Sequence, residues 1–292
     1  MRRLMSVVAV CLLAAGCAAG EAGGDGSAAP VTSTTAASAY PDPPAASDTS
    51  TPQATAAFAS IVASVQMTGA TTDGLDELVE AGDARHAWLV SDLLRFTSDP
   101  TDLEPLVSAF EALTGVDPTA HPSHAGSPWV NITNHLIVWD LPAPPEYREM
   151  KQRLFTIVEP RWEPFFADTD SALDWRLVSW GGVLIDDRSL GNDLPCMRGC
   201  IPALDDPELT DATGGAWYPD DAIVFGIALG GEVVALPRNI MEVHEMVNMT
   251  VGGHRLGIPY CTLCGSAQAF FTDGAAAEGI VLRTSGLLHR SN

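Results

Sequence analysis

The chain has 292 residues, of which 37 are acidic and 15 are basic, so its formal net charge at pH 7 is -22. A nucleic acid would be repelled by this charge, and no basic patch stands out in the sequence to hold phosphates, which excludes a nucleic-acid partner. The same excess of acidic residues is typical of a solvated domain that stays soluble outside the cytoplasm.

Residues 1–16 have the pattern of a lipoprotein signal peptide. Arg2 and Arg3 precede an uncharged apolar run that is too short to span a bilayer. The run ends in Leu13-Ala14-Ala15-Gly16-Cys17, which resembles a bacterial lipobox, so Cys17 is the predicted lipidation site. We therefore expect a protein that a lipid anchors to the cell membrane on its extracytoplasmic face, in the periplasm or at the cell surface. The alternative is ordinary signal cleavage nearby, which would leave Cys17 as a thiol or discard it.

Residues 17–57 are predicted to be a disordered linker. The segment consists mainly of Ala, Gly, Ser, Thr, Pro and Asp, and Val31 and Tyr40 are almost its only larger apolar residues. Such a composition cannot build a core. As a flexible tether of about 40 residues, the linker would have a root-mean-square span of roughly 35 Å.

Residues 58–173 are predicted to form a helical domain, because apolar residues recur with the 3.6-residue period of an α-helix. Gly82 is expected to end one short helix, and Asp83 to cap the next. Asp99-Pro100 is expected to end that helix, and Asp102 to begin its successor, with Pro105 in the first turn. The short antiparallel helices resemble HEAT-type repeats. The periodic positions include Phe58, Ile61, Val62, Val65, Leu75, Leu78, Leu89, Leu93, Leu106 and Phe110, and a later helix from Tyr147 to Val158.

Residues 174–292 are predicted to form a β-rich domain with short helices, so the whole chain is expected to have an α+β fold. Gly230-Gly231 lies between two apolar runs and is expected to make a two-residue hairpin turn. Gly252-Gly253 is expected to make a second turn, after a short helix in the segment Asn239–Asn248. The predicted strands are 175–180, 183–185, 222–229, 233–236, 267–271 and 280–282.

The segment Tyr260-Cys261-Thr262-Leu263-Cys264-Gly265 predicts a site, because it places two soft ligands on one tight turn. Gly265 can adopt a positive φ, which lets backbone N–H groups approach the thiolates. A metal bound by Cys261, Cys264 and His244 is one hypothesis. The metal would be zinc or copper, with a fourth ligand from Cys196, Cys200, His254 or Glu245.

Copper(I) is the second metal to consider, since thioethers are soft donors and Met241, Met246 and Met249 surround His244 in the sequence. The preferred interpretation of these methionines is that they fill a buried helix face.

Two further hypotheses compete with the metal site. A thiol-disulfide oxidoreductase would use Cys261 and Cys264, although the residues after them predict a strand and not the helix that lowers a thiol pKa. A structural or binding lipoprotein would use the cysteines as disulfides, with Cys196 and Cys200 as a local staple, because an even number of extracytoplasmic cysteines favours pairing. The sequence assigns no reaction. If one occurs, His244 and Glu245 are the catalytic candidates, with Asn248, Tyr260 and Ser266 in supporting positions.

Five segments of the C-terminal part resemble the domain-of-unknown-function 3179 family in order and spacing. They are Val234-Ala235-Leu236-Pro237, Val243-His244-Glu245-Met246-Val247-Asn248, Val251-Gly252-Gly253, Tyr260-Cys261-Thr262-Leu263-Cys264-Gly265-Ser266 and Ser285-Gly286-Leu287-Leu288. The resemblance covers about residues 181–292.

Three departures from the family pattern stand out. Val243 replaces a Trp, and Thr262 replaces a Pro. The sequence ends at Asn292, before a Tyr-Asp-Arg strand and a Ser-Leu-Trp-Ser segment, which predicts a truncated form of the domain. The resemblance supports the cysteine site and implies no activity.

Overall fold

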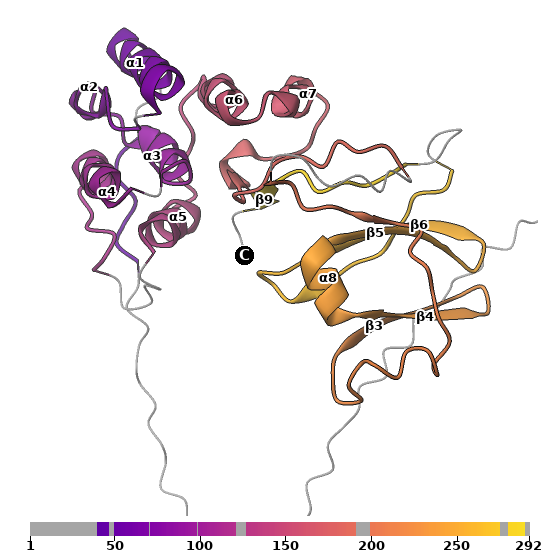
Figure 1. Ribbon diagram of the computed structural model, residues 1–292. Helices are drawn as coiled ribbons and strands as arrows, with labels where there is room; N and C mark the ends of the chain where they lie inside the picture. Colours follow the sequence, from indigo (N-terminus) through magenta and orange to yellow (C-terminus); the bar gives the residue numbers. More distant parts are fainter. Residues whose placement is uncertain are drawn as a thin grey trace, which may run out of the picture. The chain divides into compact units, whose positions relative to one another are not determined.

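The computed structural model describes residues 40–46, 50–69, 71–97, 99–120, 127–190, 199–274 and 280–289. The predicted signal peptide, Cys17 and the linker up to residue 39 lie outside these ranges. Tyr40–Asn292 form one compact unit. Its helices are mostly N-terminal and its strands C-terminal, so the predicted α+β fold is confirmed (Figure 1). No described helix combines the length and the apolar character that a membrane crossing requires.

The helical half surrounds the first of two hydrophobic cores. Apolar side chains of α1, α3, α4, α5 and α6 form this core, including the fully buried Phe58, Trp88, Phe110 and Phe155. The elements are α1 (Pro52–Thr68), α2 (Leu75–Glu80), η1 (Ala84–His86), α3 (Ala87–Leu93), α4 (Pro100–Thr114), α5 (Pro128–Val138), α6 (Tyr147–Val158), η2 (Pro160–Trp162) and α7 (Glu163–Ala167).

Helix α1 begins earlier than the linker prediction allowed. Thr51 caps it by accepting a hydrogen bond from the N–H of Ala54, and Pro52 occupies the first turn. Ala54 and Ala57 are buried, so small side chains that look like linker residues in the sequence are core residues. Contacts of the predicted linker with the helices begin earlier still, because the indole N–H of Trp139 donates to the carbonyl of Pro41 at 2.7 Å.

Helix α4 also begins earlier than predicted. Asp99 is its N-cap and accepts a hydrogen bond from the N–H of Thr101, with Pro100 in the first turn. Pro105 consequently lies inside the helix. The dipeptide Asp99-Pro100 therefore starts this helix, whereas the previous helix, α3, already ends at Leu93, so the prediction that Asp99-Pro100 ends it is wrong.

The first core extends into the C-terminal half through a two-stranded sheet. Residues Trp175–Leu177 form η3, and β1 (Val178–Trp180) pairs antiparallel with β9 (Leu287–His289). The buried Lys151 of α6 donates to the carbonyls of Trp175 and Val178, and the indole of Trp162 donates to the carbonyl of Ser285 at 2.7 Å. The helices therefore hold both strands of this small sheet.

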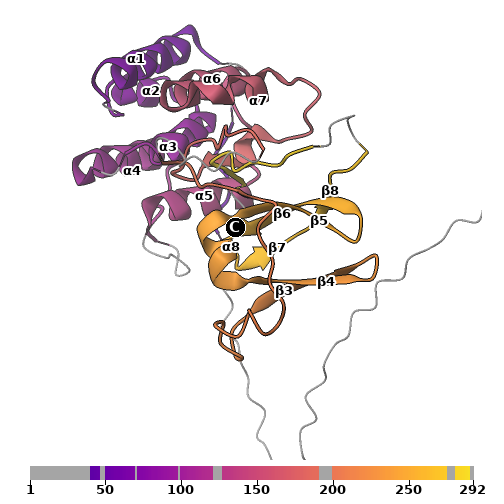
Figure 2. The ribbon, with the colours of Figure 1, turned by 45° about the vertical axis from the view of Figure 1, so that its right-hand side comes forward.

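The second core lies between a hairpin and a larger sheet. The hairpin of β3 and β4 turns at Gly230 and Gly231, whose φ values of 58° and 85° fit the predicted two-residue turn. It packs against the sheet of order β2-β5-β6-β7, in which β8 also pairs with β6 (Figure 2). The elements are β2 (Leu204–Asp205), β3 (Val224–Leu229), β4 (Glu232–Pro237), α8 (Arg238–His244), β5 (Met246–Val251), β6 (His254–Cys261), β7 (Ser266–Ala267) and β8 (Phe270–Phe271).

Five predicted elements of this half differ in the structure. Residues 175–177 of the strand expected at 175–180 form η3, and the strand expected at 267–271 is divided into β7 and β8. The helix expected over Asn239–Asn248 ends at His244, because Glu245 has a φ of 51° and residues 246–251 form β5. The strand expected at 183–185 is reduced to one bridge, from Leu184 to Cys200. Residues 280–282 are not a strand, since the backbone of Leu282 pairs with a side chain instead.

Candidate functional site

The two cysteines lie on an exposed hairpin that joins β6 to β7. Cys261 is paired with Ser266, and residues 262–265 form the turn. Gly265 has a φ of 62°, the left-handed conformation that favours glycine. The backbone N–H of Cys264 points at the sulfur of Cys261, with an N–Sγ distance of 3.3 Å. The predicted approach of an N–H group to a thiol is therefore present.

Both thiols are free, and they interact with each other. Cys264 is exposed and Cys261 is partly exposed. A hydrogen bond with Cys261 raises the pKa of the Cys264 thiol, while a hydrogen bond with Ser266 acts in the opposite direction. Ser266 thus lies beside the thiol of Cys264.

Glu245 connects this hairpin to the end of α8. Its carbonyl accepts from the N–H of Tyr260 at 2.9 Å, and its carboxylate accepts from the hydroxyl of Thr262. Tyr260 itself is buried against the second core, with its hydroxyl 3.4 Å from a carboxylate oxygen of Glu242. The base of the hairpin is therefore fixed, while its turn is open to solvent. A Pro in place of Thr262 could not make the hydrogen bond to Glu245.

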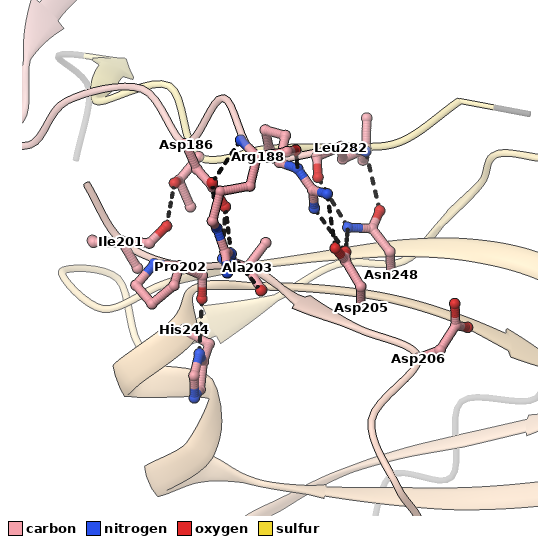
Figure 3. A network of polar contacts seen from close by, with 12 residues as sticks. Asp186, Arg188, Ile201, Pro202, Ala203, Asp205, Asp206, His244, Asn248 and Leu282 are labelled. Atoms are coloured by element: carbon pink, nitrogen blue, oxygen red, sulfur yellow. Dashed lines mark hydrogen bonds and ion pairs between the residues drawn. The ribbon is translucent and has the colours of Figure 1, made fainter. Parts of the chain in front are cut away.

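His244 points to another part of the structure. Its Nδ1 lies 2.8 Å from the carbonyl of Pro202 (Figure 3). Because a carbonyl only accepts, Nδ1 carries the proton of this hydrogen bond. Across the described ranges, no three His, Cys, Asp or Glu side chains come close enough to hold a metal ion together. The structure therefore does not gather His244 with Cys261 and Cys264.

The candidate fourth ligands are also separated from the hairpin. His254 and Cys261 are the two ends of β6, which puts them roughly 23 Å apart. His254 contacts Asp273 instead, with an N–O distance of 2.9 Å. Cys200 is disulfide-bonded, so its sulfur is not a free thiolate. Cys196 lies outside the described residues.

The three methionines near His244 are packing residues. Met241, Met246 and Met249 are all buried, and Met241 and Met249 belong to the second core. Their thioethers therefore fill the interior and do not surround the imidazole.

Asn248, on β5, is part of a largely buried polar network with Asp205 and Leu282 (Figure 3). Its amide donates to Asp205 and to the carbonyl of Leu282, and its side-chain oxygen accepts from the N–H of Leu282, all at 3.0 Å. Arg283 makes two parallel hydrogen bonds to the carboxylate of Asp205, at 2.7 and 2.8 Å. Asn248 thus acts as the strand partner that Leu282 lacks.

A second acidic residue extends this network. Asp186 accepts from the guanidinium of Arg188 at 2.7 and 2.8 Å and from the N–H of Ala203 at 2.9 Å. Burial raises the pKa of Asp186. The hydrogen bonds from Arg188 and Ala203 together lower the pKa by more than burial raises it, so the pKa of Asp186 lies below its ordinary value. The stabilisation from this ion pair is therefore present at neutral pH and is lost on acidification.

Sequence reasoning missed this network, although a local signal was present. An acidic residue two positions before an arginine occurs at Asp186 and Arg188, where the carboxylate accepts from both the arginine backbone and its guanidinium. The same arrangement occurs at three other places, namely Asp83 and Arg85, Glu159 and Arg161, and Asp174 and Arg176.

The fold and the site define an α+β protein whose β-rich C-terminal part carries an exposed pair of free cysteines. Residues 198–292 match the family described as "Protein of unknown function (DUF3179)", which confirms the resemblance seen in the sequence for this part of the chain. No curated protein and no solved structure matches the chain.

Proposed function

We propose that this chain is an extracytoplasmic, lipid-anchored protein that binds a soft metal ion, zinc or copper(I), through the Cys261–Cys264 hairpin. The observation that carries the proposal is the pairing of two free thiols on one exposed turn, with the N–H of Cys264 directed at the sulfur of Cys261. Thiolates are preferred ligands of both ions. An N–H donor stabilises the charge that a bound thiolate carries.

The state of the other cysteines supports this assignment. Cys200 is disulfide-bonded, and such bonds persist in oxidising compartments outside the cytoplasm. Two free thiols in mutual contact, one exposed and one partly exposed, would be oxidised under the same conditions. A bound metal ion would protect Cys261 and Cys264 from this fate, because it occupies both sulfurs.

Thiol-disulfide exchange is the second candidate, since the two sulfurs are close enough to interact. One feature counts against it. Cys261 ends a strand and not a loop that leads into a helix, so its sulfur lacks the helix N-terminus that activates the attacking thiol of thioredoxin-like sites.

Metal titration against a competing chelator tests the proposal. We expect Cys261→Ser and Cys264→Ser each to weaken zinc or copper(I) binding by at least about 100-fold, because each removes a direct ligand. His244→Ala is the matched control, since the structure directs His244 to Pro202. It should change the affinity less than about threefold. Undiminished binding in both serine variants would refute the proposal, and formation of a Cys261–Cys264 disulfide in place of metal binding would favour thiol-disulfide exchange.

A further inference from the structure

The hairpin offers two metal ligands, and the described part of the chain brings no third His, Cys, Asp or Glu to them. Zinc in a closed site takes four ligands, and four thiolates are a common set. Resting on the metal binding proposed above, we propose that a second copy of this chain supplies the other two thiolates. One zinc ion would then bridge two Cys261–Cys264 hairpins.

The hairpin is accessible enough to meet its own copy. Residues 262–266 are all exposed, while the base of the hairpin is held by Tyr260 and Glu245. Leu263 stands at the tip with 74% of its surface exposed. In a two-fold symmetric pair, the two copies of Leu263 would lie beside the metal and bury apolar surface against each other.

The charge distribution favours this face over the rest of the surface. Two copies that each carry a formal charge of -22 repel each other. The segment from Leu256 to Thr272 contains no charged residue, so the strands that carry the hairpin add nothing to the repulsion. The carboxylate of Glu245 lies beside the hairpin, where it accepts a hydrogen bond from the hydroxyl of Thr262.

Formation of the zinc bridge requires only that the cysteine thiols release their protons. Four thiols, two from each copy, lose four protons to solvent as one Zn²⁺ binds, which leaves a formal charge of -2 at the centre. The N–H of Cys264 in each copy donates toward a bound sulfur of Cys261 and offsets part of this charge. No oxidant or reductant is required.

The test is zinc titration of the full chain with Cys11 and Cys17 replaced by Ser, handled without oxygen after two free thiols per chain have been counted. Sedimentation velocity and metal analysis then report mass and stoichiometry together. We expect a shift from 30.7 kDa to twice that mass, complete at about half an equivalent of zinc. Added salt should strengthen the dimer by screening its like charges.

Two variants separate the outcomes. Cys261→Ser with Cys264→Ser should stay monomeric with zinc, and Leu263→Asp should keep both thiols but weaken the dimer at least about tenfold through added charge at the contact. A monomer that binds one zinc per chain would overturn the bridge and leave the metal site standing. No zinc binding would overturn both, and a dimer that persists without zinc would overturn the bridge.

Discussion

A Lys151→Met variant is expected to lose about 3–5 kcal/mol of its free energy of unfolding, because it removes the cation that pairs with the buried carboxylate of Asp92. Lys151 is the single lysine of the chain and is fully buried. Its ammonium donates to Asp92 at 3.1 Å, to the hydroxyl of Tyr147 at 3.1 Å and to the carbonyls of Trp175 and Val178. Against a typical total of about 5–15 kcal/mol, this loss is large.

Urea unfolding followed by circular dichroism measures this loss. Arg153→Met is the matched control, because Arg153 is on the same helix but exposed, and it should cost less than about 1 kcal/mol. Adding Asp92→Asn to Lys151→Met should recover part of the loss, since no unpaired charge then remains. Amide exchange of Val178 should become faster in the single variant. If the Lys151→Met chain were as stable as the natural one, the hydrogen bonds from Lys151 would not be what holds β1 against α6.

An Asn248→Ala variant is expected to lose about 2–4 kcal/mol, because it removes three hydrogen bonds and leaves backbone groups of Leu282 without partners. Asn248 is fully buried. Its side-chain amide accepts from the N–H of Leu282 and donates to the carbonyl of Leu282. The segment that contains Leu282 leads into β9, so its release should also weaken the pairing of β1 with β9.

The matched control is Asn239→Ala, because Asn239 is exposed on α8 and its replacement should change stability by less than about 0.5 kcal/mol. The two roles considered for Asn248 make opposite predictions for metal binding. If it orients a metal ligand, its loss weakens binding about 10- to 100-fold. The structure directs its amide to Asp205 and Leu282, so we expect folded Asn248→Ala to bind metal as tightly as the natural chain. Weakened binding in chains shown to be folded would contradict this role.

Much of the helical half could be predicted because helix periodicity is a local property. Helix α6 has the predicted bounds of Tyr147 and Val158, and Asp83 caps the next turn as expected. The errors fall at boundaries. Asp99 could end one helix or cap the next, and the sequence pattern fits both. Alanines such as Ala54 carry too weak an apolar signal to distinguish a buried helix from a linker.

The β-rich half was less predictable, because strand pairing depends on residues that are distant in sequence. Whether Leu282 lies in a strand depends on its partner, and that partner is a side chain of β5. The helix prediction at α8 ran too far because residues 246–251 are apolar in a pattern that suits either structure, and the positive φ of Glu245 decides between them.

The cysteine pair of the candidate site could be predicted from spacing alone, since a two-residue separation keeps Cys261 and Cys264 on one turn. Its other members could not. His254 precedes Cys261 closely in sequence, but an extended strand separates the two. His244 belongs to a separate segment of the family pattern that precedes the cysteines, and its imidazole bonds the carbonyl of Pro202, a contact that no local rule reveals.

X-ray absorption at the metal edge of the loaded chain tests the central claim most directly, because it identifies the atoms bound to the ion. With zinc, the account predicts a shell of sulfur atoms at about 2.3 Å. That shell should be lost when Cys261 and Cys264 are both replaced by Ser. A spectrum with only nitrogen and oxygen neighbours at about 2.0–2.2 Å, unchanged in the double variant, would show that the metal binds elsewhere and contradict the account.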